Sequence, residues 1–590
     1  MKKNPFPKKI VTVDFCVIGG GMAGICAAIS AARNGISVAI VQDRPMFGGN
    51  ASSEVRMWIS GAQGPNNQEG GILEEIQLRN LYRNPYKNYS IWDGILFEIV
   101  KEHENIQVFL NTTCIDGEME GNRLISATCW QLTSQSYVTI NATYFADCSG
   151  DSILAPITGA SYVQGREAKS QYQESFGPDK ADSFTMGNSI LLQAKECTDD
   201  RSFIAPSWAK KIPDEFLENR KPDLRAITEN YWYLELGGTQ DTIADAETIR
   251  DDLLSLAYGM WDYLKNDPGQ KEKNKRFELD WVGMLPGKRE SRRYVGDITL
   301  TANDIETGGL FKDVVAYGGW PMDDHHPGGF YAKAEPNINH PAPSPFGIPY
   351  RTLYSENIEN LFFAGRNISV SHAAFSSTRV MGTCSLLGQA IGTAAAIAVT
   401  YGLSPREVGR SKLHLLQQTL MDDDCYLPNV TRAIPSISKD AKLMATSNNS
   451  SIDNLRNGLD RPGTDGDNGW YGYKNDIIEY TFPSPQAIKK IRIVFDSDFN
   501  RMTLPQDGLK RNMYTNKLLS FEPFYVPKTL VKEFTLQFLS GEEEIKELEI
   551  KNNIKRLVTF EVDDEVTDIR LILKETWGSE QVHVFSFDVE

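Results

Sequence analysis

Two adjacent histidines, His325 and His326, directly follow Asp323 and Asp324 in a chain that contains only 7 histidines. Imidazole exchanges a proton near neutral pH, so a histidine in a pocket can act as a general acid or base. Four consecutive residues rarely converge on one metal ion, so a metal site here is disfavoured. We therefore predict a substrate-pocket role for His326, with no metal.

A second cluster of groups that could do chemistry contains Arg289, Glu290, Arg292 and Arg293. Guanidinium groups can grip an anion through two parallel hydrogen bonds. We take Arg289 as a candidate catalytic residue. An internal salt-bridge network is the alternative, and it is favoured for Arg292 and Arg293. Further candidates, each of which could also be structural, are Arg56, Arg379 and the aromatic residues Trp232, Trp320 and Tyr350.

The 8 cysteines are scattered and never form a C-x-x-C pair. This spacing argues against a zinc site, an iron–sulfur cluster or dithiol redox chemistry. Cys16 and Cys26 fall inside expected secondary structure, where a free thiol behaves as a small apolar side chain.

The element best suited to position a ligand is a glycine turn at residues 19–24, between an apolar strand-like run and an alanine-rich helix-like run. In the pattern G-x-G-x-x-G, Gly19 permits a tight turn, Gly21 lets the backbone approach a pyrophosphate, and Gly24 lets helix and strand pack closely. Val38–Val41 is the expected second strand, so the sequence predicts a βαβ dinucleotide-binding unit.

The end of that second strand departs from the usual pattern, in which an acidic residue binds the ribose hydroxyls. Position 42 is Gln42, and Asp43 follows. An amide oxygen still accepts a hydrogen bond, without assistance from charge. Gln42, or Asp43 after a shift of one residue, is the expected ribose contact, and two solvated turn residues are the alternative.

The formal charge of −17, from 61 basic and 78 acidic residues, argues against nucleic-acid binding, which requires a basic surface. The sequence contains no run of eighteen or more apolar residues, so it does not predict a membrane span. The basic N-terminus leads into the first strand and not into a signal-peptide core. We expect a cytoplasmic protein, or a periplasmic one if a leader has been removed.

Composition divides the chain into several regions, as its length predicts. Dinucleotide-domain character covers residues 10–166, is interrupted by a less regular region at 167–345, and returns at 346–405 with a glycine-ended strand and a small-residue helix. A helical linker is expected at 406–428. From 429 to 590, alternating strands separated by Asn, Asp, Gly and Pro predict a β-sandwich.

Residues 10–420 resemble the FAD-dependent oxidoreductase family of bacterial flavoproteins, distant relatives of fumarate reductases and L-aspartate oxidases. The likeness rests on the glycine turn and on five further motifs, at residues 48–52, 147–151, 289–293, 320–327 and 364–372. Residues 429–590 resemble galactose-binding-like jelly rolls of the discoidin type, through 465–470 and 571–578. The fold class implied is α/β: a Rossmann-type FAD-binding domain interrupted by an α+β substrate domain, followed by an all-β jelly-roll sandwich.

The resemblance implies FAD as the cofactor and assigns residues to it. It places His372 near the flavin ring, as a base able to take a proton from a substrate hydroxyl. No histidine precedes His103, so we expect the FAD to be non-covalent. The implied cofactor-binding residues are Gly19, Gly21, Met22, Ala23, Gly24, Gln42, Asp43, Gly49, Asn50, Ser52, Cys114, Gly150, Asp151, Gly365 and Arg366.

The leading functional hypothesis is an FAD-dependent oxidoreductase that oxidises a small polar substrate, a carbohydrate or a derivative, with His372 or His326 as base. One alternative is a reductase of activated double bonds, in which arginines grip a carboxylate. Another is a carbohydrate-binding protein whose flavin domain is mainly structural. A glycan is a candidate partner of the C-terminal domain, and the electron acceptor is left open.

Overall fold

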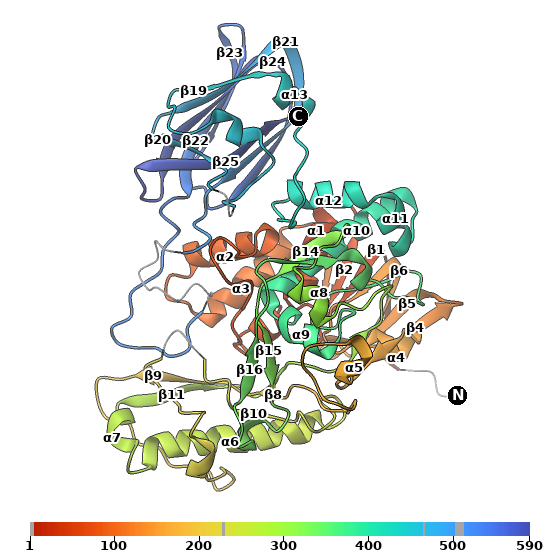
Figure 1. Cartoon of the computed structure of the whole chain (residues 1–590), viewed down its shortest axis with the longest axis vertical. Helices are drawn as coiled ribbons and strands as arrows, with labels where there is room; N and C mark the ends of the chain where they lie inside the picture. Colours follow the sequence, from red (N-terminus) through yellow and green to blue (C-terminus); the bar gives the residue numbers. More distant parts are fainter. Residues whose placement is uncertain (1–4, 227–229, 464–465, 502–512) are drawn as a thin grey trace. The chain divides into compact units, whose positions relative to one another are not determined.

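The structure of the chain is a computed structural model that describes residues 5–226, 230–463, 466–501 and 513–590 (Figure 1). The chain forms two compact units. The first contains residues 1–63, 87–416 and 511–522. The second contains residues 64–86, 417–510 and 523–590. The second unit therefore takes a segment from the early part of the chain in addition to the expected C-terminal region.

The first unit is built on a mixed sheet whose strands run in the order β3-β2-β1-β6-β5-β4. β1 (Lys8–Ile18) pairs in parallel with β2 (Val38–Val41) and β6 (Ser136–Asp147), and β2 pairs in parallel with β3 (Ile106–Phe109). β5 (Arg123–Gln131) and β4 (Thr112–Glu120) continue the sheet antiparallel. All four residues of β2 are buried, as expected for an inner parallel strand.

Two helices with small residues pack together beside this sheet. α1 (Met22–Arg33) follows β1, and α10 (Met381–Tyr401) comes from the late part of the chain (Figure 1). A Cβ on Gly388 would lie 2.0 Å from the backbone oxygen of Ala23, and one on Gly392 would lie 2.3 Å from that of Ala27. The small residues of α10 therefore let its backbone approach that of α1 closely.

The same α10 is long and apolar enough to cross a membrane by length and composition, the one helix of which this holds among the described residues. Its most apolar window is 94% buried inside the fold, as is common for the core helix of a domain.

The return of the chain to the first sheet is also confirmed. β18 (Leu361–Phe363) pairs in parallel with β6, with Leu361 opposite Phe145 and Phe363 opposite Asp147. The late glycine-ended strand therefore joins the sheet formed by the first 150 residues. The cofactor-type domain is interrupted, as the sequence predicts.

The interrupting region combines one long helix with short strand pairs. α6 (Ala246–Asn266) buries Leu253, Leu256 and Met260 in a local apolar cluster. The strands that matter for the site are β8 (Asn188–Ser189), β10 (Glu235–Leu236), β12 (Gly287–Lys288), β15 (Met322–His325) and β16 (Asn337–His340). The remaining pairs are β9 (Leu192–Glu196) with β11 (Phe277–Val282), β7 (Tyr162–Val163) with β13 (Arg293–Tyr294), and β14 (Val314–Gly318) with β17 (Phe346–Pro349).

Other helices of the first unit are short or lie between the strands. They are α3 (Tyr89–Lys101), α4 (Leu154–Thr158), α5 (Lys169–Tyr172), α7 (Lys271–Asn274), α8 (Ala302–Glu306), α9 (His372–Thr378) and α11 (Pro405–Ser411). The expected helical linker at 406–428 contains two helices, α11 and α12 (Leu413–Asp422), which are separated by Lys412. A capping box at Ser404 and Glu407 fixes the start of α11.

The second unit contains an all-antiparallel sheet with the strand order β20-β25-β21-β24-β22-β23, and β19 (Lys442–Ala445) also pairs with β21. The other strands are β20 (Trp470–Tyr473), β21 (Ile477–Phe495), β22 (Val531–Ser540), β23 (Glu543–Ile550), β24 (Leu557–Thr576) and β25 (Gln581–Val589). Helices α2 (Gly71–Arg83) and α13 (Ser436–Asp440) belong to the same unit. The long strand β21 pairs with β24, and its register shifts between Thr481 and Gln486, around Pro483 and Pro485. Proline has no N–H to donate to the ladder, which explains the interruption.

Candidate functional site

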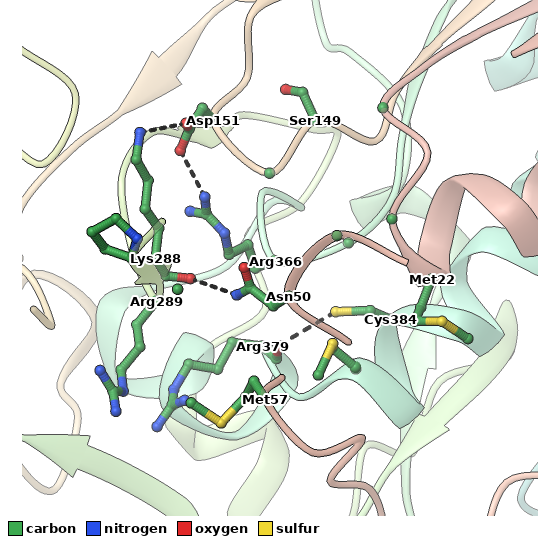
Figure 2. Close-up of a pocket in the computed structure, with 18 of the residues that line it drawn as sticks. Met22, Asn50, Met57, Ser149, Asp151, Lys288, Arg289, Arg366, Arg379 and Cys384 are labelled. Atoms are coloured by element: carbon green, nitrogen blue, oxygen red, sulfur yellow. Dashed lines mark hydrogen bonds and ion pairs between the residues drawn. The ribbon is translucent and has the colours of Figure 1, made fainter. Parts of the chain in front are cut away.

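A cavity of about 810 Å³ lies in the first unit. Its walls come from the turn between β1 and α1, the loop after β2, the turn after β6, the start of α10 and the strand pairs of the interrupting region (Figure 2). Segments that are hundreds of residues apart therefore meet at one hollow, as in a site for an extended ligand.

The glycine turn forms one wall of this cavity. Gly19 has φ +105°, and a Cβ there would lie 2.5 Å from the Cys148 backbone. A Cβ on Gly24 would lie 1.8 Å from the Gly19 oxygen, so this glycine allows strand and helix to touch. Gly21 is the N-cap of α1, no side chain caps the helix there, and Gly21, Met22 and Ala23 line the cavity. An uncapped helix N-terminus facing a cavity favours an anion such as a phosphate.

The loop after β2 crosses close to this turn. Gly48 and Gly49 have φ +107° and +56°, and a Cβ on Gly49 would lie 3.1 Å from the Cα of Gly21. The amide of Gly20 donates to Oε1 of Gln42 at 2.7 Å. Asn50 Nδ2 donates to the backbone oxygen of Lys288 at 3.0 Å, which links the loop to the interrupting region (Figure 2).

A charged cluster lies on the wall between these two regions. Asp151 receives Nζ of Lys288 at 2.8 Å and Nη2 of Arg366 at 2.6 Å, as Figure 2 shows. Burial opposes ionisation of Asp151, but Arg366 and Lys288 outweigh it and hold the pKa of the carboxyl well below its usual range. The cluster joins three separate segments of the cavity wall and keeps them in register.

Another part of the cavity contains a histidine held by carboxylates. Nδ1 of His325 lies 2.7 Å from Oε2 of Glu235, and Nε2 lies 3.2 Å from Oδ2 of Asp323. The Trp232 ring packs 4.6 Å from the His325 ring. Arg289 contacts the same Glu235 oxygen at 3.3 Å. His325 is 4% exposed and lines the cavity, so it is both fixed in orientation and beside the space a ligand would fill.

Both carboxylates of this group are ionised. Burial opposes the charge on Glu235, but Arg289 and His325 lower the pKa of its carboxyl below the ordinary value. At Asp323, burial is likewise outweighed by His325 and Arg379, which hold the pKa well below its usual range. Nη2 of Arg379 lies 2.9 Å from Asp323 Oδ2 and makes this contact from the end of α9.

Comparison with known proteins identifies the family. The model of the family described as FAD dependent oxidoreductase matches residues 14–420. The chain belongs to this family. The match covers the interrupted dinucleotide-type domain and the region inserted into it, which together contain the whole cavity.

Individual relatives of this FAD dependent oxidoreductase are distant. A 3-oxosteroid 1-dehydrogenase of Mycobacterium tuberculosis is 35% identical over 99 residues, which cover 17% of this chain and only 16% of that protein. A myxobacterial FAD-dependent halogenase, CndH, aligns with 13% identity over 70% of this chain and 80% of its own, with a TM-score of 0.31. The lectin domain of lectinolysin aligns with 10% identity over 27% of this chain and 97% of its own, with a TM-score of 0.20.

The residues around the cavity fit FAD. The uncapped start of α1 and the bare Cα atoms of Gly21 and Gly49 leave room where a pyrophosphate would contact the backbone. Arg44, at the far end of β2, also lines the cavity, and its Nη1 is buried with no hydrogen-bond partner in the described part of the chain. When bound, FAD supplies the two-electron acceptor or donor, and the protein supplies orientation and proton transfer.

Most of the cofactor residues predicted from the sequence line this one cavity. Those that do are Gly19, Gly21, Met22, Ala23, Gln42, Asp43, Gly49, Asn50, Cys114, Gly150, Asp151, Gly365 and Arg366. Gly24 and Ser52 do not line it. Gly24 lies at the strand–helix contact, and Ser52 is 1% exposed. Gln42 uses its amide oxygen to bind Gly20, so only Asp43, of the two candidate ribose contacts, keeps a largely exposed side chain.

The structure places His372 behind the cavity wall. This first residue of α9 lies between two carboxylates, with Nδ1 3.0 Å from Glu290 and Nε2 3.3 Å from Asp324, and it does not line the cavity. Burial lowers the pKa of His372, but Glu290 and Asp324 outweigh it and raise the pKa to about 9. Because His372 does not line the cavity, it is not placed to exchange a proton with a ligand there, and it serves as a charged partner of Glu290 and Asp324.

The structure distinguishes the two neighbouring histidines, of which His326 was the one predicted to lie in the substrate pocket. His326 is exposed, accepts a hydrogen bond from the Gly328 amide at 3.0 Å and does not line the cavity, whereas His325 does. Successive side chains of a strand point to opposite faces, and β15 ends at His325. The adjacent histidines in the sequence indicated which segment contributes to the cavity, but not which of the two residues lines it. Glu235 and Asn188, which line or support the site, had no signal in the sequence.

The other candidates divide between cavity and core. Arg289, Arg379, Trp232 and Trp320 line the cavity. Arg293 is buried in ion pairs with Glu167 and Glu290, the structural alternative that the sequence favoured. Tyr350 is fully buried, and Arg56 stacks on Tyr89 and Trp281. Among the described residues no group of His, Cys, Asp and Glu is arranged to hold a metal ion.

Proposed function

We propose that this FAD-dependent oxidoreductase oxidises an alcohol group of a small polyhydroxylated substrate, with His325 as the base that takes the hydroxyl proton. The observation that carries the proposal is the position of His325, beside the cavity and fixed through Nδ1 by a buried, ionised Glu235. A histidine that donates one N–H to a carboxylate is oriented to accept a proton at its other nitrogen.

The two contacts of His325 differ in a way that supports this role. The Glu235 contact is short, at 2.7 Å, and the Asp323 contact is long, at 3.2 Å. Asp323 also receives Arg379 at 2.9 Å and Asn337 at 2.5 Å. Asp323 therefore remains hydrogen-bonded if a substrate hydroxyl replaces it at Nε2 of His325. The aromatic walls provided by Trp232 and Trp320 favour a sugar ring or a similar amphipathic molecule.

A second function is favoured by a different observation. Arg289 and Arg379 both line the cavity close to His325, as the reduction of an activated double bond conjugated to a carboxylate would require. In that reaction His325 would donate a proton instead of accepting one. The direction of flavin chemistry separates the two functions.

The experiment is anaerobic visible spectroscopy of the FAD-loaded protein against a panel of sugars, sugar acids and hydroxy acids. Substrate-dependent bleaching of the flavin supports alcohol oxidation. If no alcohol bleaches it, and dithionite-reduced protein is instead reoxidised by an enoate, the reductase function replaces the proposal.

Two variants then test the base. His325→Gln should keep FAD and its reduction by dithionite, but slow flavin reduction by substrate by about 10²-fold or more. His326→Gln tests the neighbouring residue predicted from the sequence. A slow His326→Gln together with an unaffected His325→Gln would overturn the assignment of His325.

A further inference from the structure

Two buried arginines from different segments lie next to one another at the cavity. Arg289 directly follows β12, and Arg379 ends α9. Figure 2 shows their side chains extending in the same direction, away from the Lys288–Asp151–Arg366 cluster. The Arg289 side chain is 7% exposed and that of Arg379 is 12% exposed. Burial lowers the pKa of Arg289, and the neighbouring Arg379 charge lowers it further.

The protein uses only part of each guanidinium. In Arg289, Nη1 makes every contact: to the Gly187 oxygen at 3.1 Å, to Ser189 Oγ at 2.8 Å and to Glu235 at 3.3 Å. In Arg379, Nη2 contacts the backbone oxygen and Oδ2 of Asp323 at 3.1 and 2.9 Å. Within the described residues, Nη2 of Arg289 and Nη1 of Arg379 have no protein acceptor and are not sealed by protein atoms, and both residues line the cavity.

The carboxylates nearby are shared, which leaves the guanidiniums short of acceptors. Oε2 of Glu235 faces both Arg289 and His325. Oδ2 of Asp323 faces both Arg379 and His325. Glu235 and Asp323 are therefore the shared acceptors of two guanidinium groups and one imidazole. Buried guanidinium N–H groups without acceptors are costly, and a carboxylate matches their planar geometry.

We propose that Arg289 and Arg379 bind the carboxylate of an anionic polyhydroxy substrate, a sugar acid or a related hydroxy acid. This inference rests on the proposed function, since it seats the carboxylate at the arginines and the reacting hydroxyl at His325. A bound carboxylate supplies the hydrogen-bond acceptors that Nη2 of Arg289 and Nη1 of Arg379 lack, and its planar geometry matches theirs. Arg289 also lies 5.6 Å from the Trp232 ring, so the anion site adjoins the aromatic wall.

The test compares each hexuronate with the hexose of the same ring configuration, in the gluco, galacto and manno series. The FAD-loaded full chain is titrated anaerobically, and both flavin reduction and perturbation of the oxidised flavin spectrum are followed. We expect hexuronates to act at concentrations about 10-fold or more below those of their hexoses, because charge-assisted hydrogen bonds are lost with the neutral sugar.

The arginine dependence is tested by Arg379→Gln, which should weaken the hexuronate by about 10- to 100-fold, with Arg379→Lys between it and the natural protein. FAD content and thermal midpoint show whether each variant is folded. Arg351→Gln is the matched control, because Arg351 forms an Arg–Asp pair with Asp313 at 2.9 Å and does not line the cavity.

The outcomes separate the two proposals. If hexoses reduce the flavin at the same concentrations as hexuronates, the anion site is overturned and alcohol oxidation still stands. Hexuronates that perturb the spectrum in an Arg379-dependent way without reducing the flavin support the anion site and overturn the oxidation. If no hexuronate binds, or if binding is the same in Arg379→Gln, the anion site is overturned.

Discussion

Nδ1 of His325 lies 2.7 Å from Oε2 of Glu235, a carboxylate that is 2% exposed. Its other oxygen, Oε1, accepts the Gly187 amide at 2.9 Å, which fixes the carboxylate within the strand pair β8–β10. The orientation of the imidazole is therefore set by a short strand of the interrupting region. Any change at Glu235 should act through His325 and Arg289, the two groups this carboxylate positions.

Glu235→Gln should retain FAD but slow flavin reduction by substrate by about 10-fold or more, since the amide no longer stabilises a positive charge on His325. Stopped-flow measurement of flavin reduction by substrate checks the rate, and flavin content and thermal midpoint show whether the variant is folded. An unchanged rate in a folded, FAD-replete Glu235→Gln would contradict the positioning role of Glu235.

The charge on His372 should make the stability of the protein depend on pH. Its pKa is raised to about 9 from an ordinary 6.5, so the charged form is favoured by folding. The resulting stability is fully present below about pH 6.5 and is lost as pH rises through 9, an effect on the order of 3 kcal/mol. Thermal unfolding of the holoprotein between pH 6 and 10 should show this loss, and His372→Gln should flatten it. An equal loss in His372→Gln would assign the pH dependence to other groups.

The Rossmann part of the fold could be predicted from local sequence pattern. The strand, glycine turn and helix at residues 15–33 follow a local pattern, in which Gly24 is required by the backbone of nearby Gly19, although the Cys148 backbone that restricts Gly19 comes from a distant segment. The small residues of α10 allow close packing, but the sequence did not show that the partner is the helix α1. Two statements stay predictions: that the glycine turn at residues 19–24 binds the phosphates of FAD, and that residues 429–590 bind a glycan.

The polar part of the site could be predicted only as a set of segments. His325 and His326 are adjacent, and which one faces the cavity depends on where β15 begins, a property of its pairing with β16. Glu235 lies on a strand of two residues with no periodic pattern, 90 residues from the histidine it contacts. The His372 prediction missed two carboxylates from distant segments, the buried Glu290 and the partly exposed Asp324.

Gly24 and Gly94 form a matched pair of glycine variants. Gly24→Ala should cost at least about 2 kcal/mol and deplete FAD, since its Cβ would lie 1.8 Å from the Gly19 backbone oxygen. Gly94→Ala, inside α3 with no atom within 4 Å of the new Cβ, should stabilise the protein by about 0.5–1 kcal/mol. Thermal midpoints and flavin-to-protein ratios measure both. A flavin-replete, stable Gly24→Ala would contradict the close strand–helix contact.

Asp460 supports the buried charges of the second unit. Its Oδ2 lies 2.7 Å from Nη2 of Arg492 and 3.3 Å from Nε of Arg432, and these two arginines are 4% exposed. Burial opposes ionisation of Asp460, but Arg492 and Arg432 lower the pKa of its carboxyl below the ordinary value. Asp460→Ala leaves the two buried guanidiniums to share Asp588, with Asp422 at 3.4 Å from Arg432 as a more exposed partner, and we expect a loss of about 3–5 kcal/mol.

The matched control for Asp460 is Asp453→Ala, which removes the partner of Arg456 at the surface. That pair has a 2.8 Å contact, but the Asp453 side chain is 69% exposed, so water solvates the remaining arginine and the loss should stay below about 1 kcal/mol. Both variants should keep FAD, since the cavity lies in the first unit. Limited proteolysis followed by intact-mass analysis would show the second unit opening selectively in Asp460→Ala. Equal protection of the two variants would mean that Asp588 and Asp422 suffice to neutralise Arg432 and Arg492.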